Sequence, residues 1–181
     1  ARRAASESCA KALGLTFLRD ALPEDLSCAH HDEREAKEWR LELVDSSVNR
    51  SLTALEEREG PATFPRGWVR HAFHDMTLVG RASYLLKHAD ELGYRAFEEA
   101  GRIFTESFIS MLDELRVSRP EIDAAVEACL MHGALGARIV GGGFGGAVMA
   151  LVKTSRLEET AQAIAQAYAE HGYAEPRFLP M

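Results

Sequence analysis

The residues best suited to chemistry form a glycine-rich segment near the C-terminus. Five of the six residues in 141–146 are glycine (GGGFGG), and apolar runs flank them on both sides. Each glycine destabilises a strand by roughly 0.5–1 kcal/mol relative to alanine, so this density indicates a backbone path or a close approach that a Cβ would block. Exposed backbone N–H groups in such a loop can bind an anion. We therefore predict a loop that faces an anion or a substrate, or that packs behind a phosphate-holding loop.

Two other interpretations of these glycines stay open. A tight hairpin needs glycines merely for positive φ angles. Gly141, Gly143 and Gly146 also satisfy the GxGxxG pattern of dinucleotide-binding folds, but that pattern requires a helix to begin at its last glycine. Residues 147–152 (AVMALV) instead continue as an apolar, β-prone run, which disfavours dinucleotide binding.

Other side chains are weaker candidates. His30 and His31 are adjacent and have no further spaced ligand, so a solvated surface cluster is favoured over a metal site. His71 and His74 lie three apart on an expected helix, where capping or packing is favoured over a metal or catalytic function. Nothing nearby would lower the pKa of Cys129, which we expect to be a buried core residue. We predict no metal site.

The elements expected around the glycines are two strands and a preceding helix. The apolar runs 137–140 and 147–152 predict two strands joined by the glycines. A capping box at 118–121 (SRPE), with proline at the first helical position, predicts a helix that ends near residue 132. The residues that this helix should bury are Ile122, Val126 and Cys129.

A second helix should follow the strands. A capping box at 155–158 (SRLE) opens it, an apolar stripe follows, and Gly172 closes it. Residues 177–179, bounded by prolines, predict a last edge strand. This order of elements predicts an α+β fold, in which an antiparallel sheet is backed by helices.

The earlier part of the chain has helical character. From 68 to 115 apolar residues recur at helical spacing and predict two helices divided at Gly93. Two prolines and two glycines in 60–67 mark the best internal boundary. We therefore expect a helical segment with an irregular connection over 1–66, and an α+β domain over 67–181.

Composition restricts the class of protein. Twenty-eight acidic and 21 basic side chains give a net charge of -7, which disfavours a general nucleic-acid or anionic-membrane surface. Three widely spaced cysteines suggest neither a disulfide framework nor a zinc site, and no apolar run is long enough to cross a membrane. We expect a cytoplasmic protein without nucleic-acid or membrane partners. The start at Ala1, without an initiator methionine, agrees with a chain that begins inside a longer protein.

Residues 133–152 (GALGARIVGGGFGGAVMALV) are similar to the third signature motif of the GHMP kinases, in its galactokinase form. Three weaker segments support the resemblance in the same order along the chain: 2–20, the Arg-His pair at 70–71, and 117–123 (VSRPEID). Together the four segments span most of the chain. The stretch 22–66 aligns poorly with the family and is a candidate insertion.

The sequence also departs from the family's pattern. Ile139 and Val140 stand where relatives usually have Met-Thr, so a threonine hydroxyl contact is missing. Phe108 replaces a histidine, and Leu112 and Leu115 replace an arginine and a tyrosine. These differences leave room for a related kinase with another substrate.

The resemblance implies the ferredoxin-like α+β fold of the GHMP kinase C-terminal domain, extended by further helices near the start. It also implies a site in which the glycine segment closes over the sugar and supports the phosphate loop, with Arg138 as a structural or loop-orienting cation. The residues expected to contribute are Gly141, Gly142, Gly143, Phe144, Gly145, Gly146 and Arg138.

The activity that the resemblance implies is ATP-dependent phosphorylation of galactose at its anomeric hydroxyl. The family's sugar-binding motif and its Pro-Gly-Ser-rich phosphate loop do not occur in this sequence, so it offers no catalytic residue. ATP and Mg²⁺ would be bound mainly by an N-terminal half, which is the expected partner of this chain, and the chain alone should be inactive. The alternatives are a kinase for another sugar or small alcohol, and a non-catalytic sugar-sensing or binding module.

Overall fold

The computed structural model describes residues 66–141 and 146–179, together with Lys11. The chain divides into two compact units, Ala1–Gly80 and Arg81–Met181, which are considered separately. The helical segment with an irregular connection expected over 1–66 lies outside the described residues, apart from Lys11 and Arg66, which are both helical. The domain boundary expected near residue 66 stays a prediction.

Two long helices precede the strands, as the apolar spacing predicts. Helix α3 (Arg66–Lys87) leads through the short α4 (Ala89–Leu92) to α5 (Tyr94–Ser110), and Gly93 separates the last two with a φ of 65°. The π-helical turn η3 (Met111–Leu115) continues α5 and ends at Arg116, which has a left-handed φ of 52°. The division at Gly93 is confirmed, and the additional break before α4 was not expected.

The apolar runs around the glycines form an antiparallel hairpin. Strand β1 (Ala134–Ile139) pairs with β2 (Val148–Val152), with Ala137 opposite Ala150 and Ile139 opposite Val148. The register is irregular between Ala134 and Gly136. Both strands are confirmed, and β1 begins three residues earlier than predicted because the pairing continues past the irregularity.

Helix α6 (Pro120–Met131) precedes the hairpin, but the capping box predicted at its start is wrong. The residue before a proline is held in an extended conformation. Arg119, with φ -137° and ψ 155°, is therefore the N-cap residue, and no side chain caps the helix. The Ser118 hydroxyl instead donates a hydrogen bond to the Asp123 carboxylate.

The capping box predicted before α7 (Leu157–His171) is also wrong. The 3₁₀ turn η4 (Thr154–Arg156) precedes the helix, and the Arg156 N–H donates to the Lys153 carbonyl at 2.8 Å. Ser155 lies inside this turn, so it does not act as the N-cap residue. Gly172 closes α7 with a φ of 70°, as predicted.

The edge strand predicted at 177–179 is not formed. Residues 173–179 have no regular secondary structure, and the sheet in the described part of the chain consists of β1 and β2. Pro176 has no N–H to donate to a neighbouring strand. Phe178 and Leu179 are 46% and 86% exposed, so they bury too little apolar surface to hold the segment on the sheet.

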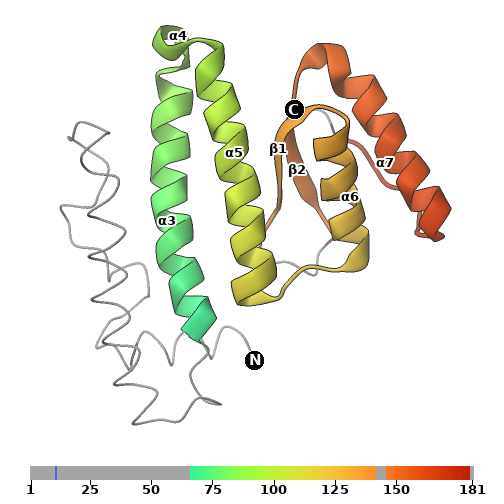
Figure 1. The fold of residues 1–181 in the computed structure, drawn as a ribbon, viewed down its shortest axis with the longest axis horizontal. Helices are drawn as coiled ribbons and strands as arrows, with labels where there is room; N and C mark the ends of the chain where they lie inside the picture. Colours follow the sequence, from blue (N-terminus) through green and yellow to red (C-terminus); the bar gives the residue numbers. More distant parts are fainter. Residues whose placement is uncertain (1–10, 12–65, 142–145, 180–181) are drawn as a thin grey trace. The chain divides into compact units, whose positions relative to one another are not determined.

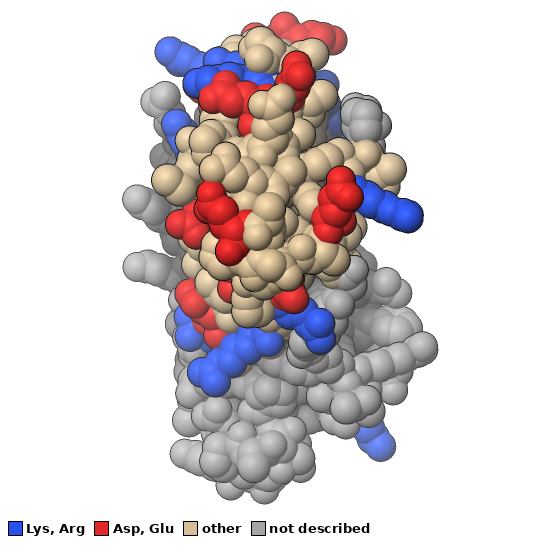
Figure 2. Space-filling view, turned by 90° about the vertical axis from the view of Figure 1, so that its right-hand side faces the viewer, with Lys and Arg blue, Asp and Glu red and all other residues tan. Residues whose placement is uncertain are grey.

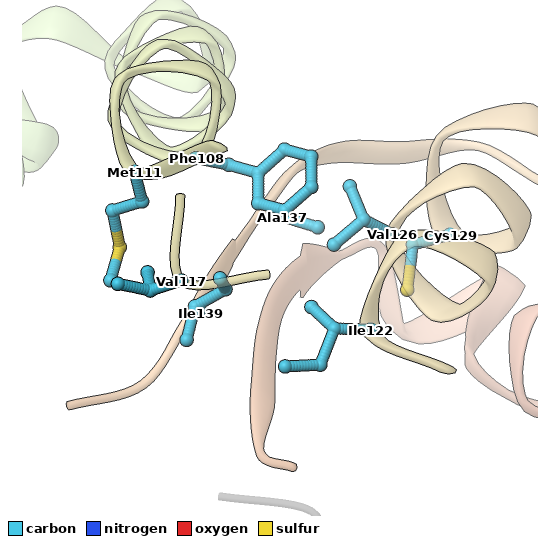
Figure 3. Packing of buried hydrophobic residues seen from close by; sticks show 8 residues of the cluster. All are labelled: Phe108, Met111, Val117, Ile122, Val126, Cys129, Ala137 and Ile139. Carbon is cyan, nitrogen blue, oxygen red and sulfur yellow. The ribbon is translucent and has the colours of Figure 1, made fainter. Parts of the chain in front are cut away.

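The core lies around β1. Figure 1 shows α5 on one side of the strand pair and α6 with α7 on the other. Between them, side chains from α5, η3, the connection that follows η3, α6 and β1 form one cluster, drawn in Figure 3. Its members are Phe108, Met111, Val117, Ile122, Val126, Cys129, Ala137 and Ile139. The predicted burial of Ile122, Val126 and Cys129 and the sheet backed by helices are thus confirmed.

Helices α6 and α7 are joined near both ends. The Thr160 hydroxyl lies 2.8 Å from the Arg156 carbonyl oxygen at the start of α7, and 3.2 Å from the His132 carbonyl oxygen just after α6. The Tyr168 hydroxyl donates to the Glu121 carbonyl, in the first turn of α6, at 2.8 Å. Figure 2 shows the face of the molecule on which α7 lies, where uncharged residues cover a broad area between scattered acidic and basic side chains.

Candidate functional site

The glycine-rich connection occupies the turn of the hairpin. Its first and last residues, Gly141 and Gly146, are described and exposed, whereas the predicted site residues Gly142, Gly143, Phe144 and Gly145 lie outside the described part. The Val140 N–H donates to the Ala147 carbonyl at 3.0 Å, so strand pairing continues up to the loop. Both ends of the loop therefore follow directly from the same pair of hydrogen-bonded strands.

Glycine is required at both ends of this loop by backbone conformation. Gly141 and Gly146 have φ angles of 72° and 70°, which side-chain-bearing residues rarely adopt. A Cβ built at either position meets no atom of the described chain within 4 Å. The sequence allowed either a special backbone path or a close approach. At these two positions the backbone path explains the glycine, and no described residue fills the space beside either of them.

Arg138 lies in β1 opposite Met149, two residues before Val140. Its side chain is half-buried, and its Nε donates to the backbone carbonyl of Ile139 at 3.3 Å. The guanidinium therefore turns back onto its own strand as that strand approaches the loop. This contact is compatible with the loop-orienting function expected from the sequence, which stays a prediction.

The sequence analysis missed a second pair of glycines. Gly101, in the middle of α5, and Gly136, in β1, are both buried and lie against one another. A Cβ built at Gly136 would lie 1.7 Å from the Gly101 carbonyl oxygen. An isolated glycine inside a helical pattern was the available signal, because such a residue needs a packing or functional reason.

The end of β1 nearest the loop is held by the core cluster. In Figure 3 Met111 and Val117 lie beside Ile139, which is completely buried. Met111 begins η3, and the Val117 N–H donates to the Met111 carbonyl at 3.3 Å. The turn that follows α5 thus packs against Ile139, two residues before the glycine-rich connection begins.

A cavity of about 330 Å³ lies away from this loop, between α3, α4 and α5. Its lining residues are Leu85, Leu92, Arg95, Ala96, Glu98, Glu99 and Arg102. Glu99 is already engaged, since its carboxylate accepts from Arg81 at 3.1 Å and from Arg102 at 2.9 Å. None of the predicted site residues that the structure describes, Arg138, Gly141 and Gly146, lines this cavity, so it is separate from the predicted site.

The weaker candidates from the sequence are four histidines and Cys129. His71 and His74 are half-buried on α3, and no group of three or more potential metal ligands occurs within 66–141 and 146–179. His30 and His31 lie outside the described residues. Cys129 is 2% exposed, and burial raises the pKa of its thiol to about 11. The prediction that Cys129 is a buried core residue is confirmed. None of the described helices could span a membrane.

The helix-backed hairpin defines the class, an α+β domain, and comparison with known proteins identifies the family. The family model described as "GHMP kinases C terminal" matches residues 70–174. The chain belongs to the GHMP kinase family and carries its C-terminal domain.

Individual relatives agree with this assignment. The galactokinase of Streptomyces coelicolor is 37% identical over 126 residues, which is 70% of this chain and 31% of the relative. The galactokinase of Bos taurus is 33% identical over 174 residues, which is 96% of this chain and 35% of the relative. The chain therefore spans about a third of the length of these curated relatives.

A solved structure has the same fold. The crystal structure of Lactococcus lactis galactokinase complexed with galactose matches 96% of this chain and 38% of its own, with a TM-score of 0.55 and 23% identity. At this identity the match establishes the fold alone. It confirms the α+β architecture predicted from the order of elements and from the resemblance.

Proposed function

We propose that this chain is the C-terminal part of an ATP-dependent sugar kinase, one that transfers the γ-phosphoryl group of ATP to the anomeric hydroxyl of galactose. The observation that carries the proposal is a hydrogen-bonded hairpin that leads into the glycine-rich segment through two exposed glycines, Gly141 and Gly146, in a chain of the GHMP kinase family. The relatives named as galactokinases support the choice of sugar.

The chemistry explains why an open glycine loop suits this function. Phosphoryl transfer depends on positioning and on neutralising the charge of the triphosphate with Mg²⁺ and cationic groups. No side chain crowds Gly141 or Gly146 in the described chain, so a sugar or another loop can approach the backbone closely. Gly141–Gly146 close over the sugar and support the phosphate loop, and Arg138 orients the strand that leads to them.

The remaining parts of the reaction belong to an N-terminal half of the protein. That half holds ATP and Mg²⁺ and supplies the catalytic groups, so this chain by itself does not turn over substrate. The expected location is the cytoplasm, where ATP and the sugar are both available.

One observation favours a second candidate, a kinase for another sugar or small alcohol. Leu112 and Leu115 replace an arginine and a tyrosine of the family's pattern. Leu112 is 38% exposed, and Leu115 packs against the core. Neither leucine can donate the hydrogen bonds of the residues that it replaces. Replacing an arginine and a tyrosine by these two leucines would shift the substrate preference of the enzyme.

A coupled ADP-release assay on the full-length gene product, with MgATP and a panel of sugars and small alcohols, tests the proposal. Galactose should give the highest kcat/KM. Preference for another acceptor would select the second candidate, and no turnover with any acceptor would leave a sensing or binding module that has lost the chemistry.

A loop variant tests the site itself. Gly143→Val in the full-length enzyme should abolish turnover while the protein stays folded, because the side chain fills the space reserved for substrate. Gly172→Val is the matched control, since Gly172 closes α7 away from the loop with a φ of 70°. It should reduce stability and leave turnover of the folded enzyme intact. Normal activity in Gly143→Val would contradict the assignment of the loop.

A further inference from the structure

The backbones of α5 and β1 touch where Gly101 meets Gly136. A Cβ built at Gly136 would lie 1.7 Å from the carbonyl oxygen of Gly101 and 2.3 Å from its carbonyl carbon. A Cβ built at Gly101 would lie 2.4 Å from the carbonyl carbon and oxygen of Leu135. Real Cβ atoms essentially never approach other atoms within 3.0 Å. Glycine is therefore required on both sides of this contact.

Both glycines stand where local structure disfavours them. Gly101 is in the interior of a 17-residue helix, and Gly136 is in a six-residue strand. Glycine weakens both kinds of element because it loses the most conformational freedom on folding. The two positive φ angles at the ends of the loop do not explain these residues, but the backbone contact does.

The contact between Gly101 and Gly136 is the first of two points at which β1 packs against α5 and the turn that follows α5. The irregular register between Ala134 and Gly136 ends at this point, and the strand pairing is regular from Gly136 to Ile139. The second point is Ile139, which packs with Met111 and Val117 just after α5. Between the two points β1 is hydrogen-bonded to β2, and the ladder reaches Val140 and Ala147.

Resting on the function proposed above, we infer that Gly101 and Gly136 are positioning residues for phosphoryl transfer. Their contact sets the distance between α5 and β1, and β1 carries Gly141 five residues further along. A Cβ at Gly136 would have to move from 1.7 Å to at least 3.0 Å from the Gly101 oxygen, a displacement of at least 1.3 Å. A misplacement of about 1 Å can lower an enzymatic rate about 100-fold.

Steady-state kinetics of full-length Gly101→Ala and Gly136→Ala test this inference. The matched control is the double variant Thr160→Val with Tyr168→Phe, which loosens α7 from α6 without touching β1. Rates are measured at a temperature at which circular dichroism shows every variant to be fully folded. The glycine variants should lose at least tenfold in kcat/KM for galactose, mainly in kcat, and the control should stay within about twofold of the unmodified enzyme.

A purely structural contact would give a different result. Folded glycine variants with kinetics like those of the control would overturn the inference. Gly101→Ala provides the milder perturbation, because its closest distance is 2.4 Å rather than 1.7 Å. If neither variant folds at any temperature, the contact is a requirement for folding and the positioning function is likewise rejected.

Hydrogen exchange separates this inference from the proposed function. Peptides covering 134–152 should lose protection in the glycine variants, whereas peptides from α6 and α7 keep it. If the unmodified enzyme phosphorylates no acceptor, the proposed function fails, and exchange alone decides whether the contact positions the loop. Unchanged exchange in 134–152 would overturn the inference whatever the enzyme's activity.

Discussion

The Tyr168 hydroxyl donates a hydrogen bond to the Glu121 carbonyl at 2.8 Å and so ties the second half of α7 to the first turn of α6. Tyr168→Phe keeps the ring and removes this bond, which should lower the free energy of unfolding by about 1 kcal/mol. Thr160→Val removes a hydroxyl that lies 2.8 Å from the Arg156 carbonyl oxygen and 3.2 Å from the His132 carbonyl oxygen, and should cost a similar amount.

Thr160 and Tyr168 are eight positions apart on α7, which corresponds to about 12 Å along the helix. The losses of unfolding free energy caused by the two substitutions should therefore add. Urea denaturation of the single and double variants measures this. A double variant no less stable than either single variant would show that the two hydrogen bonds do not act independently.

Two kinds of glycine should respond differently to alanine. Gly141→Ala places a side chain at a φ of 72° with open space around it, so it should cost about 1–2 kcal/mol of backbone strain. Gly136→Ala places a Cβ against the backbone of Gly101, and should cost more because α5 and β1 must separate. Thermal denaturation of both variants gives the order, and equal melting temperatures would contradict this account of the two positions.

Cys129 should make stability fall at alkaline pH. Burial raises the pKa of its thiol to about 11, whereas an unfolded thiol titrates near its ordinary value of about 9. Below pH 9 both states are protonated. Between pH 9 and 11 only the unfolded state loses its proton, so the folded state loses up to roughly 3 kcal/mol of stability.

Tyr168 contributes in the same direction, because burial and the nearby Glu121 carboxylate raise the pKa of its hydroxyl. Cys129→Ala should therefore remove only part of the alkaline loss. Unfolding free energies of both proteins at pH 8 and pH 10.5 measure that part. An identical loss in the two proteins would mean that Cys129 is not the titrating group.

The two ion pairs of Glu99, one with Arg81 of α3 and one with Arg102 within α5, should make a small, salt-dependent contribution to stability. Glu99 accepts from Arg81 at 3.1 Å and from Arg102 at 2.9 Å, with its own side chain 31% exposed. Glu99→Gln should cost about 0.5–1 kcal/mol at low salt and less in 1 M NaCl, where charges are screened over about 3 Å. Denaturation at both salt concentrations checks this, and a cost that does not change with salt would point to packing instead.

The sequence was most informative where local chemistry decides the structure. Helical spacing and glycine predicted the division at Gly93, and the apolar runs predicted the hairpin with Val140 and Ala147 at its turn. The two predicted capping boxes were wrong because of neighbouring residues. Pro120 holds Arg119 in an extended conformation, so Arg119 is the N-cap residue of α6, and Ser155 lies inside a 3₁₀ turn before α7.

The contact between Gly101 and Gly136 could not be predicted because it joins residues 35 positions apart in the sequence. A lone glycine in a helix signals that something comes close, but only the fold identifies what does. The edge strand predicted at 177–179 was wrong because it, too, depended on contacts that the local sequence does not determine. Whether a short apolar run becomes a strand depends on a free sheet edge and on burial, and Leu179 is 86% exposed.

The most direct test of the account is a ³¹P NMR experiment with MgATP and galactose, run in parallel on the full-length gene product and on the 181-residue chain. The account predicts an anomeric sugar phosphate and stoichiometric ADP from the full-length protein, and neither product from the chain alone. Sugar phosphate formed by the chain alone, or none formed from any sugar by the full-length protein, would contradict it.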